Sequence, residues 1–210
     1  MTEDRPAPLR QHSGSQALAL SFDDGPDPHW TPRLLDTLRD LEVRATFFPI
    51  SARARSHPEL VRRTLREGHG VGLHGALHLR HPHCPADLLA VDTRLAVAWL
   101  AVEDLRLWRP PYGLCAAPTR RLAAEYGLEL IGWSVDTNDW RASSTVSAML
   151  AHSAPQIGPG AVVLMHDGIG PGPESGTDAV RSSCAPTLDL VGQLVAESRA
   201  RGLSLAPISE

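Results

Sequence analysis

The sequence has few cysteines, no long apolar run and no excess of basic charge. Its three cysteines (Cys84, Cys115 and Cys184) are an odd number without CxxC spacing, which argues against a disulfide framework and a thiolate zinc site. No run approaches the ~20 apolar residues that a membrane-spanning helix needs, so we expect no membrane partner. The net charge of −4 leaves no basic stripe for a phosphate backbone, which excludes nucleic acid as an expected partner. Glycans and other neutral small molecules fit this charge better.

The first residues also lack the apolar core of a secretory signal. Residues 1–16 are polar, contain proline and show no periodicity, so they predict a mobile tail in front of one catalytic domain, residues 17–210. No repeat or linker divides that domain. We expect a monomer that is cytoplasmic as given, or secreted if an export signal has been removed.

Apolar runs alternate with helical periodicity along the whole domain. Such alternation predicts parallel strands joined by right-handed helical crossovers, either as an open α/β sheet or as a barrel-like closure. The first strand is predicted to begin near residue 17, and the other strands to cover about 44–50, 71–73, 105–108, 128–135, 161–165 and 203–208. Helices are predicted at about 31–41, 58–67, 85–103, 118–126, 144–157 and 186–201.

Polar residues follow nearly every predicted strand: Asp23-Asp24, His74, Arg109, Asp136 and His166. The carboxyl ends of parallel strands lie at one edge of a sheet, so these side chains are expected to converge. Any one of them alone is an ordinary turn residue. Five at matching positions predict a functional site.

Two histidines and a carboxylate have the spacing of a metal site. His74 and His78 lie four residues apart in HGALH, which leaves both imidazoles on one side of a helical turn or strand. Asp24 completes a two-His, one-carboxylate set that suits a divalent metal with open positions. The alternative is a histidine-rich surface loop. The remaining histidines are expected to be solvated: His12, His29, His57, His69, His81, His83 and His152.

With a metal bound, the adjacent aspartates can divide their roles. Asp24 binds the metal while Asp23 takes a proton from water, whose pKa a metal lowers towards ~7–9. Arg109 can orient Asp23 and hold its pKa down. His166 can protonate a leaving group, and Asp136 is the candidate partner of its other ring nitrogen.

Two apolar residues and one loop each allow two interpretations. Trp140 and Leu164 either wall a small apolar pocket or belong to the core. In the loop at 168–176, Glu174, with Asp178 and Arg181 beyond it, either touches substrate or belongs to a solvated loop, and we expect a solvated loop.

The motifs together resemble the metal-dependent polysaccharide deacetylases of carbohydrate esterase family four. All five family motifs have counterparts in order: SFDDGP, HGALH, RPPYG, DTNDW and VLMHD. The resemblance implies a base at Asp23, metal ligands at Asp24, His74 and His78, an orienting Arg109, an oxyanion-binding N–H at Tyr112, an acid-tuning Asp136, a groove-lining Trp140, an acetyl-pocket wall at Leu164 and an acid at His166.

The resemblance also implies a fold, a metal and a reaction. The implied fold is a single-domain, distorted (β/α) barrel with about seven parallel strands. The implied cofactor is one divalent metal ion, with zinc as the first choice and cobalt or nickel as alternatives. The reaction is removal of an N-acetyl group from an amino sugar, a chitooligosaccharide- or peptidoglycan-type glycan or a soluble sugar conjugate. The alternatives are a C–N hydrolase on a small non-carbohydrate amide and a non-catalytic glycan-binding domain. Gly75 departs from the usual Ser or Thr, which puts the metal affinity in doubt.

Overall fold

The computed structural model describes residues 12–170 and 181–209, and strands alternate with helices through this part of the chain. The strands are β1 (Ala19–Asp23), β2 (Thr46–Phe48), β3 (Gly70–Val71), β4 (Leu107–Trp108), β5 (Glu129–Leu130), β6 (Val135–Asp136) and β7 (Val162–His166). The α-helices are α1 (Trp30–Asp40), α2 (Ser51–Ser56), α3 (Pro58–Arg66), α4 (Ala86–Leu100), α5 (Ala117–Glu125), α6 (Val146–Ser153) and α7 (Ala185–Ala200).

The strands form an interrupted barrel. Five are parallel in the order β3-β2-β1-β7-β6, and β4 pairs with β5 in a second parallel sheet. A bridge between Leu73 and Trp108 joins the two sheets on one side. On the other side the chain itself connects them, because Ile131 still pairs with Trp108 and Ser134 already pairs with Val162. The predicted α/β class and distorted barrel are confirmed, with five rather than seven strands in the main sheet.

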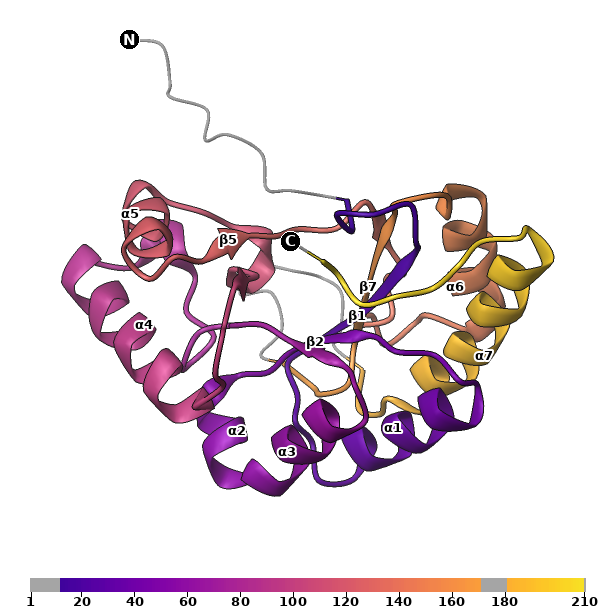
Figure 1. Ribbon diagram of the computed structural model, residues 1–210, viewed down its shortest axis with the longest axis horizontal. Coiled ribbons are helices and arrows are strands. Elements are labelled where there is room, and N and C mark those ends of the chain that lie inside the picture. Colours follow the sequence, from indigo (N-terminus) through magenta and orange to yellow (C-terminus); the bar gives the residue numbers. More distant parts are fainter. Residues whose placement is uncertain (1–11, 171–180, 210) are drawn as a thin grey trace, which may run out of the picture.

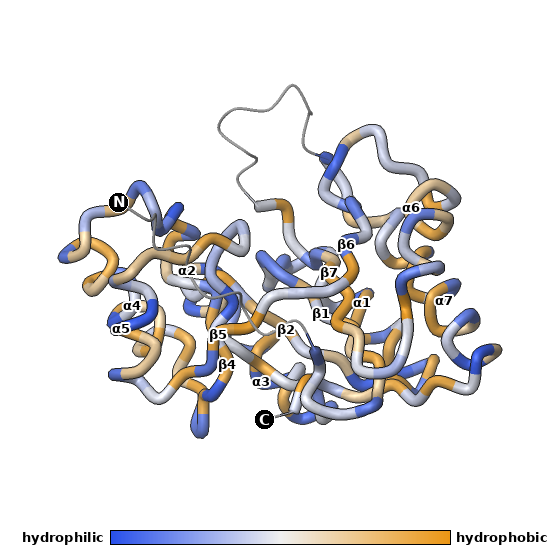
Figure 2. The backbone as a smooth tube through the Cα atoms, turned by 90° about the horizontal axis from the view of Figure 1, so that it is seen from above, coloured by the Kyte–Doolittle hydropathy of each residue, from blue (hydrophilic) through white to orange (hydrophobic). Residues whose placement is uncertain are grey.

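The helices surround the strands. Figures 1 and 2 show α4 and α5 on one flank, α6 and α7 on the other, and the strands between them. None of the helices in the described ranges is both long and apolar enough to cross a lipid bilayer.

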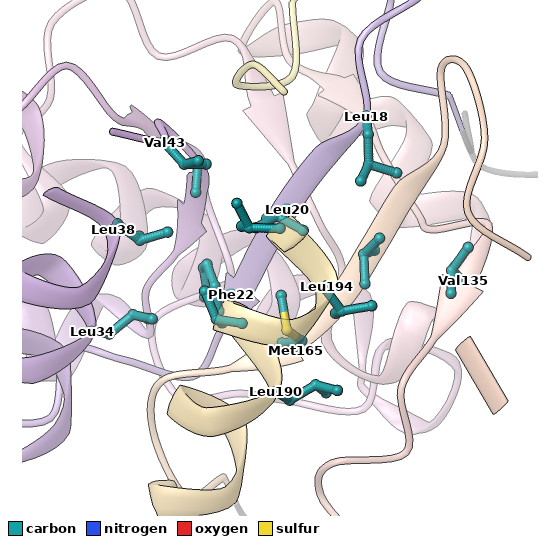
Figure 3. Close-up of a cluster of buried hydrophobic side chains, with 14 of the residues drawn as sticks. Leu18, Leu20, Phe22, Leu34, Leu38, Val43, Val135, Met165, Leu190 and Leu194 are labelled. Carbon is teal, nitrogen blue, oxygen red and sulfur yellow. The ribbon is translucent and has the colours of Figure 1, made fainter. Parts of the chain in front are cut away.

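Strand β1 lies at the centre of the sheet and is buried along its whole length. Successive strand residues point to opposite faces of the sheet, and in β1 one face packs in the core while the other faces the barrel interior. Leu20 and Phe22 pack with leucines of α1 and α7 in the main core (Figure 3). Ser21 and Asp23 therefore face the barrel interior, where both accept hydrogen bonds from Arg109. Alternation along one strand places a carboxylate at the mouth of the barrel.

The structure departs from the predicted elements in three places. The strand expected at 128–135 is divided into β5 and β6, because the carbonyl oxygen of Gly132 accepts a hydrogen bond from Arg109 instead of a strand. Residues 203–208 form only an isolated bridge at Leu205, since Pro207 has no N–H and the Ile208 N–H donates to the Thr46 hydroxyl. The short helix α2 was not predicted.

The domain begins earlier than predicted. Ser13 is fully buried, and its N–H donates to the carbonyl oxygen of Gly160 over 2.8 Å. His12 forms an antiparallel bridge with Ala161, and the Ser209 N–H donates to the carbonyl oxygen of Ser13. Residues 12–16 therefore belong to the folded domain rather than to the expected tail, whose residues 1–11 lie outside the described residues.

Candidate active site

A cavity of about 230 Å³ opens at the carboxyl ends of the strands. Every predicted catalytic, substrate-binding and metal-ligating residue lines it except Arg109, which lies fully buried behind Asp23. The predicted convergence of strand-end residues is thus confirmed. The lining is Asp23, Asp24, His74, His78, Tyr112, Trp133, Asp136, Trp140, Leu164, His166, Gly168, Ile169, Gly170 and Arg181.

Asp24, His74 and His78 form a compact, buried set of three donors. One candidate ligand atom from each lies within 4.8 Å of the others. His74 Nε2 is 3.4 Å and His78 Nε2 is 3.1 Å from Asp24 Oδ1. His74 Nδ1 donates to the carbonyl oxygen of Arg109 over 2.7 Å, which fixes the tautomer that leaves Nε2 free to bind a metal.

The donor set fits a divalent cation. Among the described residues Asp24 Oδ1 is buried and has no hydrogen-bond donor, an arrangement that is costly unless a cation fills the space. Burial alone would raise the pKa of Asp24, but the adjacent imidazoles of His74 and His78 hold it well below its usual value. The carboxylate is therefore ionised and aimed at the two imidazoles.

Gly75 is accommodated by a different support for the ligand loop. Its backbone has φ +81°, and an added Cβ would lie 3.1 Å from Asp92 Oδ2. Asp92, buried on α4, accepts hydrogen bonds from the backbone N–H groups of Ala76 and Leu77, each over 3.0 Å. A carboxylate on a neighbouring helix thus steadies the loop where the family motif has a hydroxyl. This role of Asp92 was not predictable, because the residue lies in an ordinary helical pattern.

Asp23 is held by Arg109, as predicted. Arg109 Nη1 donates to Asp23 Oδ1 over 2.8 Å and to the Ser21 hydroxyl over 2.9 Å. Asp23 Oδ2 lies 3.8 Å from His74 Nε2, so the free oxygen faces the metal ligands. Burial lowers the pKa of Arg109, opposed by the charge of Asp23, and the guanidinium remains a fixed positive charge.

The partner of His166 is Asp139, and the prediction of Asp136 was wrong. His166 Nδ1 donates to Asp139 Oδ1 over 2.7 Å, and the His166 backbone N–H donates to Asp139 Oδ2 over 3.0 Å. Burial would lower the pKa of His166, but the Asp139 carboxylate raises it to about 9. His166 is therefore an imidazolium at neutral pH. The DTNDW motif contains two aspartates, and spacing alone did not separate them.

Asp136 instead lines the cavity at the end of β6. Its Oδ1 accepts a hydrogen bond from the Asn138 backbone N–H over 2.7 Å, which turns the chain so that Asp139 can reach His166. Burial raises the pKa of Asp136. Asp136 therefore shapes the turn and the cavity wall rather than pairing with the acid.

Arg181 is buried, which corrects the expectation of a solvated residue. Only 7 % of its side chain is exposed, and Nη1 donates to Asp139 Oδ2 over 2.8 Å. Trp133 is a further cavity residue that sequence analysis missed, because it lies within the interrupted strand. Glu174 and other residues of the adjoining loop at 171–180 lie outside the described residues.

The segment after β7 packs tightly over Asp24. Arg53, on α2, donates to the carbonyl oxygens of Asp24 and Ile169, each over 2.8 Å. A Cβ added at Gly170 would lie 2.0 Å from Asp24 Oδ2, and one at Gly168 would lie 2.6 Å from the Asp24 carbonyl oxygen. Glycine at these positions lets the backbone form one wall of the ligand set.

Two further histidines are buried rather than solvated. His69 Nδ1 accepts the Ala45 N–H, and His81 Nδ1 hydrogen-bonds to the Thr119 hydroxyl over 3.0 Å. Burial lowers the pKa of both, and that of His81 falls to about 4. They support the fold and do not line the cavity.

Comparison with known proteins agrees with this geometry. A sequence model of the polysaccharide deacetylase family matches residues 10–131. The chain belongs to this family. It is 36 % identical over 206 residues to a chitooligosaccharide deacetylase of Bradyrhizobium sp. (strain ANU 289), covering 94 % of this chain and 91 % of the relative.

A second relative and a solved structure extend the comparison. A peptidoglycan-N-acetylglucosamine deacetylase of Bacillus cereus is 31 % identical, with 94 % of this chain and 89 % of the relative covered. The structure of a family 4 carbohydrate esterase from Streptomyces lividans in complex with acetate superposes with a TM-score of 0.80 at 29 % identity, covering 92 % of this chain and 93 % of the other.

Proposed function

We propose that the protein is a metal-dependent deacetylase that hydrolyses the N-acetyl group of an amino sugar in a glycan or oligosaccharide. One observation carries the proposal: a carboxylate held by a buried arginine, an imidazolium paired with a buried carboxylate, and a three-donor metal set all meet in one cavity. A glycan-binding domain has no need of a base and an acid beside a metal set.

Asp24, His74 and His78 would hold one divalent ion, with zinc proposed first and cobalt or nickel as alternatives. When bound, such an ion would supply Lewis acidity, which polarises the acetyl carbonyl and makes the attacking water easier to deprotonate. Asp23 accepts the proton of the attacking water. Its ion pair with Arg109 orients its free oxygen towards the ligand set.

His166 donates the proton that the departing amine needs. An amine anion is a poor leaving group, so C–N cleavage requires a charged acid within reach. The Asp139 carboxylate keeps that proton on His166 until the bond breaks. The backbone N–H of Tyr112 is proposed to bind the developing oxyanion. Tyr112 has φ +60°, and its ring packs edge-on against His78 at 4.6 Å between centroids.

The cavity walls suit an acetyl group on a sugar. Leu164 and Trp140 provide an apolar wall of limited size beside His166, which favours a small acyl group. Trp133 and Tyr112 add aromatic faces of the kind that sugar rings stack on. The relatives described above are named for chitooligosaccharide and peptidoglycan N-acetylglucosamine deacetylation, so both substrate classes are proposed for this chain.

An acetate-release screen tests the function. Purified protein would be stripped with a chelator, reloaded with zinc, cobalt or nickel, and incubated with N-acetylglucosamine, chitooligosaccharides, peptidoglycan fragments and small non-sugar amides. We expect metal-dependent acetate release from the glycans and none after chelation. Turnover that survives metal removal, or release from the simple amides alone, would refute the proposal.

A further inference from the structure

The Arg181 side chain joins four parts of the molecule around the acid. Its Nη1 donates to Asp139 Oδ2, to the Asp139 carbonyl oxygen over 3.1 Å and to the Thr187 hydroxyl of α7. Its Nη2 donates to the carbonyl oxygen of His166 over 2.8 Å and to that of Gly168 over 3.3 Å. A single guanidinium thus connects the loop after β6, the end of β7, the segment beyond it and the start of α7.

The same contacts saturate the Asp139 carboxylate. Oδ1 accepts from the His166 ring, while Oδ2 accepts from Arg181 Nη1, from the Thr187 hydroxyl over 2.7 Å and from the His166 N–H. The Asp139 side chain is completely buried. Every donor has a defined direction, so the carboxylate cannot rotate away from the ring without losing charged hydrogen bonds.

Without Arg181, the charge of Asp139 would be balanced by His166 alone. Four carboxylates interact electrostatically with the His166 ring, those of Asp139, Asp136, Asp23 and Asp24; Asp23 is already paired with Arg109, and Asp139 with Arg181. An imidazolium whose partner carboxylate has no other cation holds its proton too tightly to be a good acid. A second cation on Asp139 weakens that hold and stabilises Asp139 after the proton has left.

We propose that Arg181 is the positioning residue of the general acid: it fixes Asp139 against His166 and offsets enough carboxylate charge for His166 to release its proton to the departing amine. The proton moves from His166 Nε2 to the amine nitrogen, and Asp139 stays ionised between Arg181 and the neutral imidazole. This proposal rests on the proposed deacetylase function for its consequence, and on the hydrogen bonds alone for its geometry.

The test follows the His166 ring directly. Full-length protein labelled at histidine, zinc-loaded and also chelator-treated, would be titrated by NMR, with the His166 signal assigned by its absence from His166→Gln. Arg181→Gln should raise the His166 titration midpoint by about one pH unit, because a nearby cation disfavours the imidazolium. The matched control is Arg201→Gln, which removes an ion-paired arginine at the far end of α7 and should leave the midpoint unchanged.

A second variant keeps the charge and changes the shape. Arg181→Lys should leave the midpoint close to that of the parent protein but reduce kcat about 10-fold with little change in KM, since an ammonium cannot make the forked contacts. This variant still tests the positioning role if Arg181→Gln does not fold. An unchanged or lowered midpoint in Arg181→Gln, or parental kcat in Arg181→Lys, would overturn the proposal. The titration needs no substrate, so failure of the deacetylase assignment would appear separately as absent acetate release.

Discussion

The two halves of the active site are held in place by different means. On the side of β1 and β3, the metal ligands are held through hydrogen bonds that involve the main chain: the Arg109 carbonyl oxygen orients His74, and the Asp92 carboxylate accepts from two backbone N–H groups of the ligand loop. On the side of β6 and β7, the acid is fixed by charged side chains, in the row Arg181, Asp139 and His166.

This difference predicts different sensitivities. A metal site needs its ligand atoms at fixed positions, so its support must be rigid, and small changes of volume should matter most there. A proton donor needs a matched pKa, so its support must be charged, and changes of charge without change of shape should matter most there. Substitutions that change only side-chain volume should therefore affect mainly the metal side, and substitutions that change only charge should affect mainly the acid side.

The largest effect is expected at Asp23, where the two halves meet. Asp23→Asn keeps the hydrogen bond from Arg109 but removes the proton acceptor, so kcat should fall about 10³-fold while metal content is retained. His74→Ala should lose both metal and turnover. Metal analysis and acetate release on both variants check this contrast, and an active Asp23→Asn would contradict the assigned base.

The next effect tests charge on the acid side. Asp139→Asn preserves shape but removes the charge behind His166, so kcat should fall about 100-fold and the alkaline limb of the pH-rate profile should move down from near the pKa of about 9.

The matched control is Asp136→Asn, which changes an aspartate of the same cavity that does not contact the His166 ring. It should shift the alkaline limb much less. If Asp136→Asn moved the limb further than Asp139→Asn, the assignment of the acid's partner would be wrong.

The contrast between the halves also explains what the sequence could reveal. Asp23, Asp24, His74, Arg109 and His166 were predictable because each directly follows an apolar run, and parallel strands bring such positions together. The α/β class followed from the same alternation. These features are local in the sequence.

The supporting residues were not predictable, because their roles depend on contacts distant in the sequence. Asp92 reaches the ligand loop from a helix, and Arg181 reaches Asp139 from 42 positions further along the chain. The choice between Asp136 and Asp139 depends on a turn set by one backbone hydrogen bond. The break between β5 and β6 depends on a guanidinium that binds Gly132.

A smaller effect tests shape on the metal side. Gly170→Ala adds a methyl group that would lie 2.0 Å from Asp24 Oδ2, so Asp24 must shift and zinc affinity should fall about 10-fold. Competition with a chromogenic chelator measures it. The matched control, Gly192→Ala on α7, meets no atom within 4 Å and should leave affinity unchanged while raising stability by about 0.5–1 kcal/mol. Equal zinc affinities in the two variants would show that the backbone at Gly170 can move away from Asp24, and would contradict the prediction.

The smallest effect is a pH dependence of stability confined to the acid side. The pKa of His166 is raised to about 9 in the folded protein, above the ~6.5 of an unfolded histidine, so its contribution is full below ~6.5 and is lost as pH rises through 9. Asp139, with a pKa lowered to about 2, contributes fully above ~3.9 and loses its contribution only as pH falls through 2. The pair should therefore stabilise the fold most between about pH 3.9 and 6.5, where both contributions are full. Between pH 7 and 9 the melting temperature of the parent should fall a few degrees more than that of Asp139→Asn, because only the parent loses an ion pair. If the melting temperatures of the two proteins changed equally with pH, the Asp139–His166 ion pair would not stabilise the folded state. Its role would then be confined to positioning His166 for catalysis.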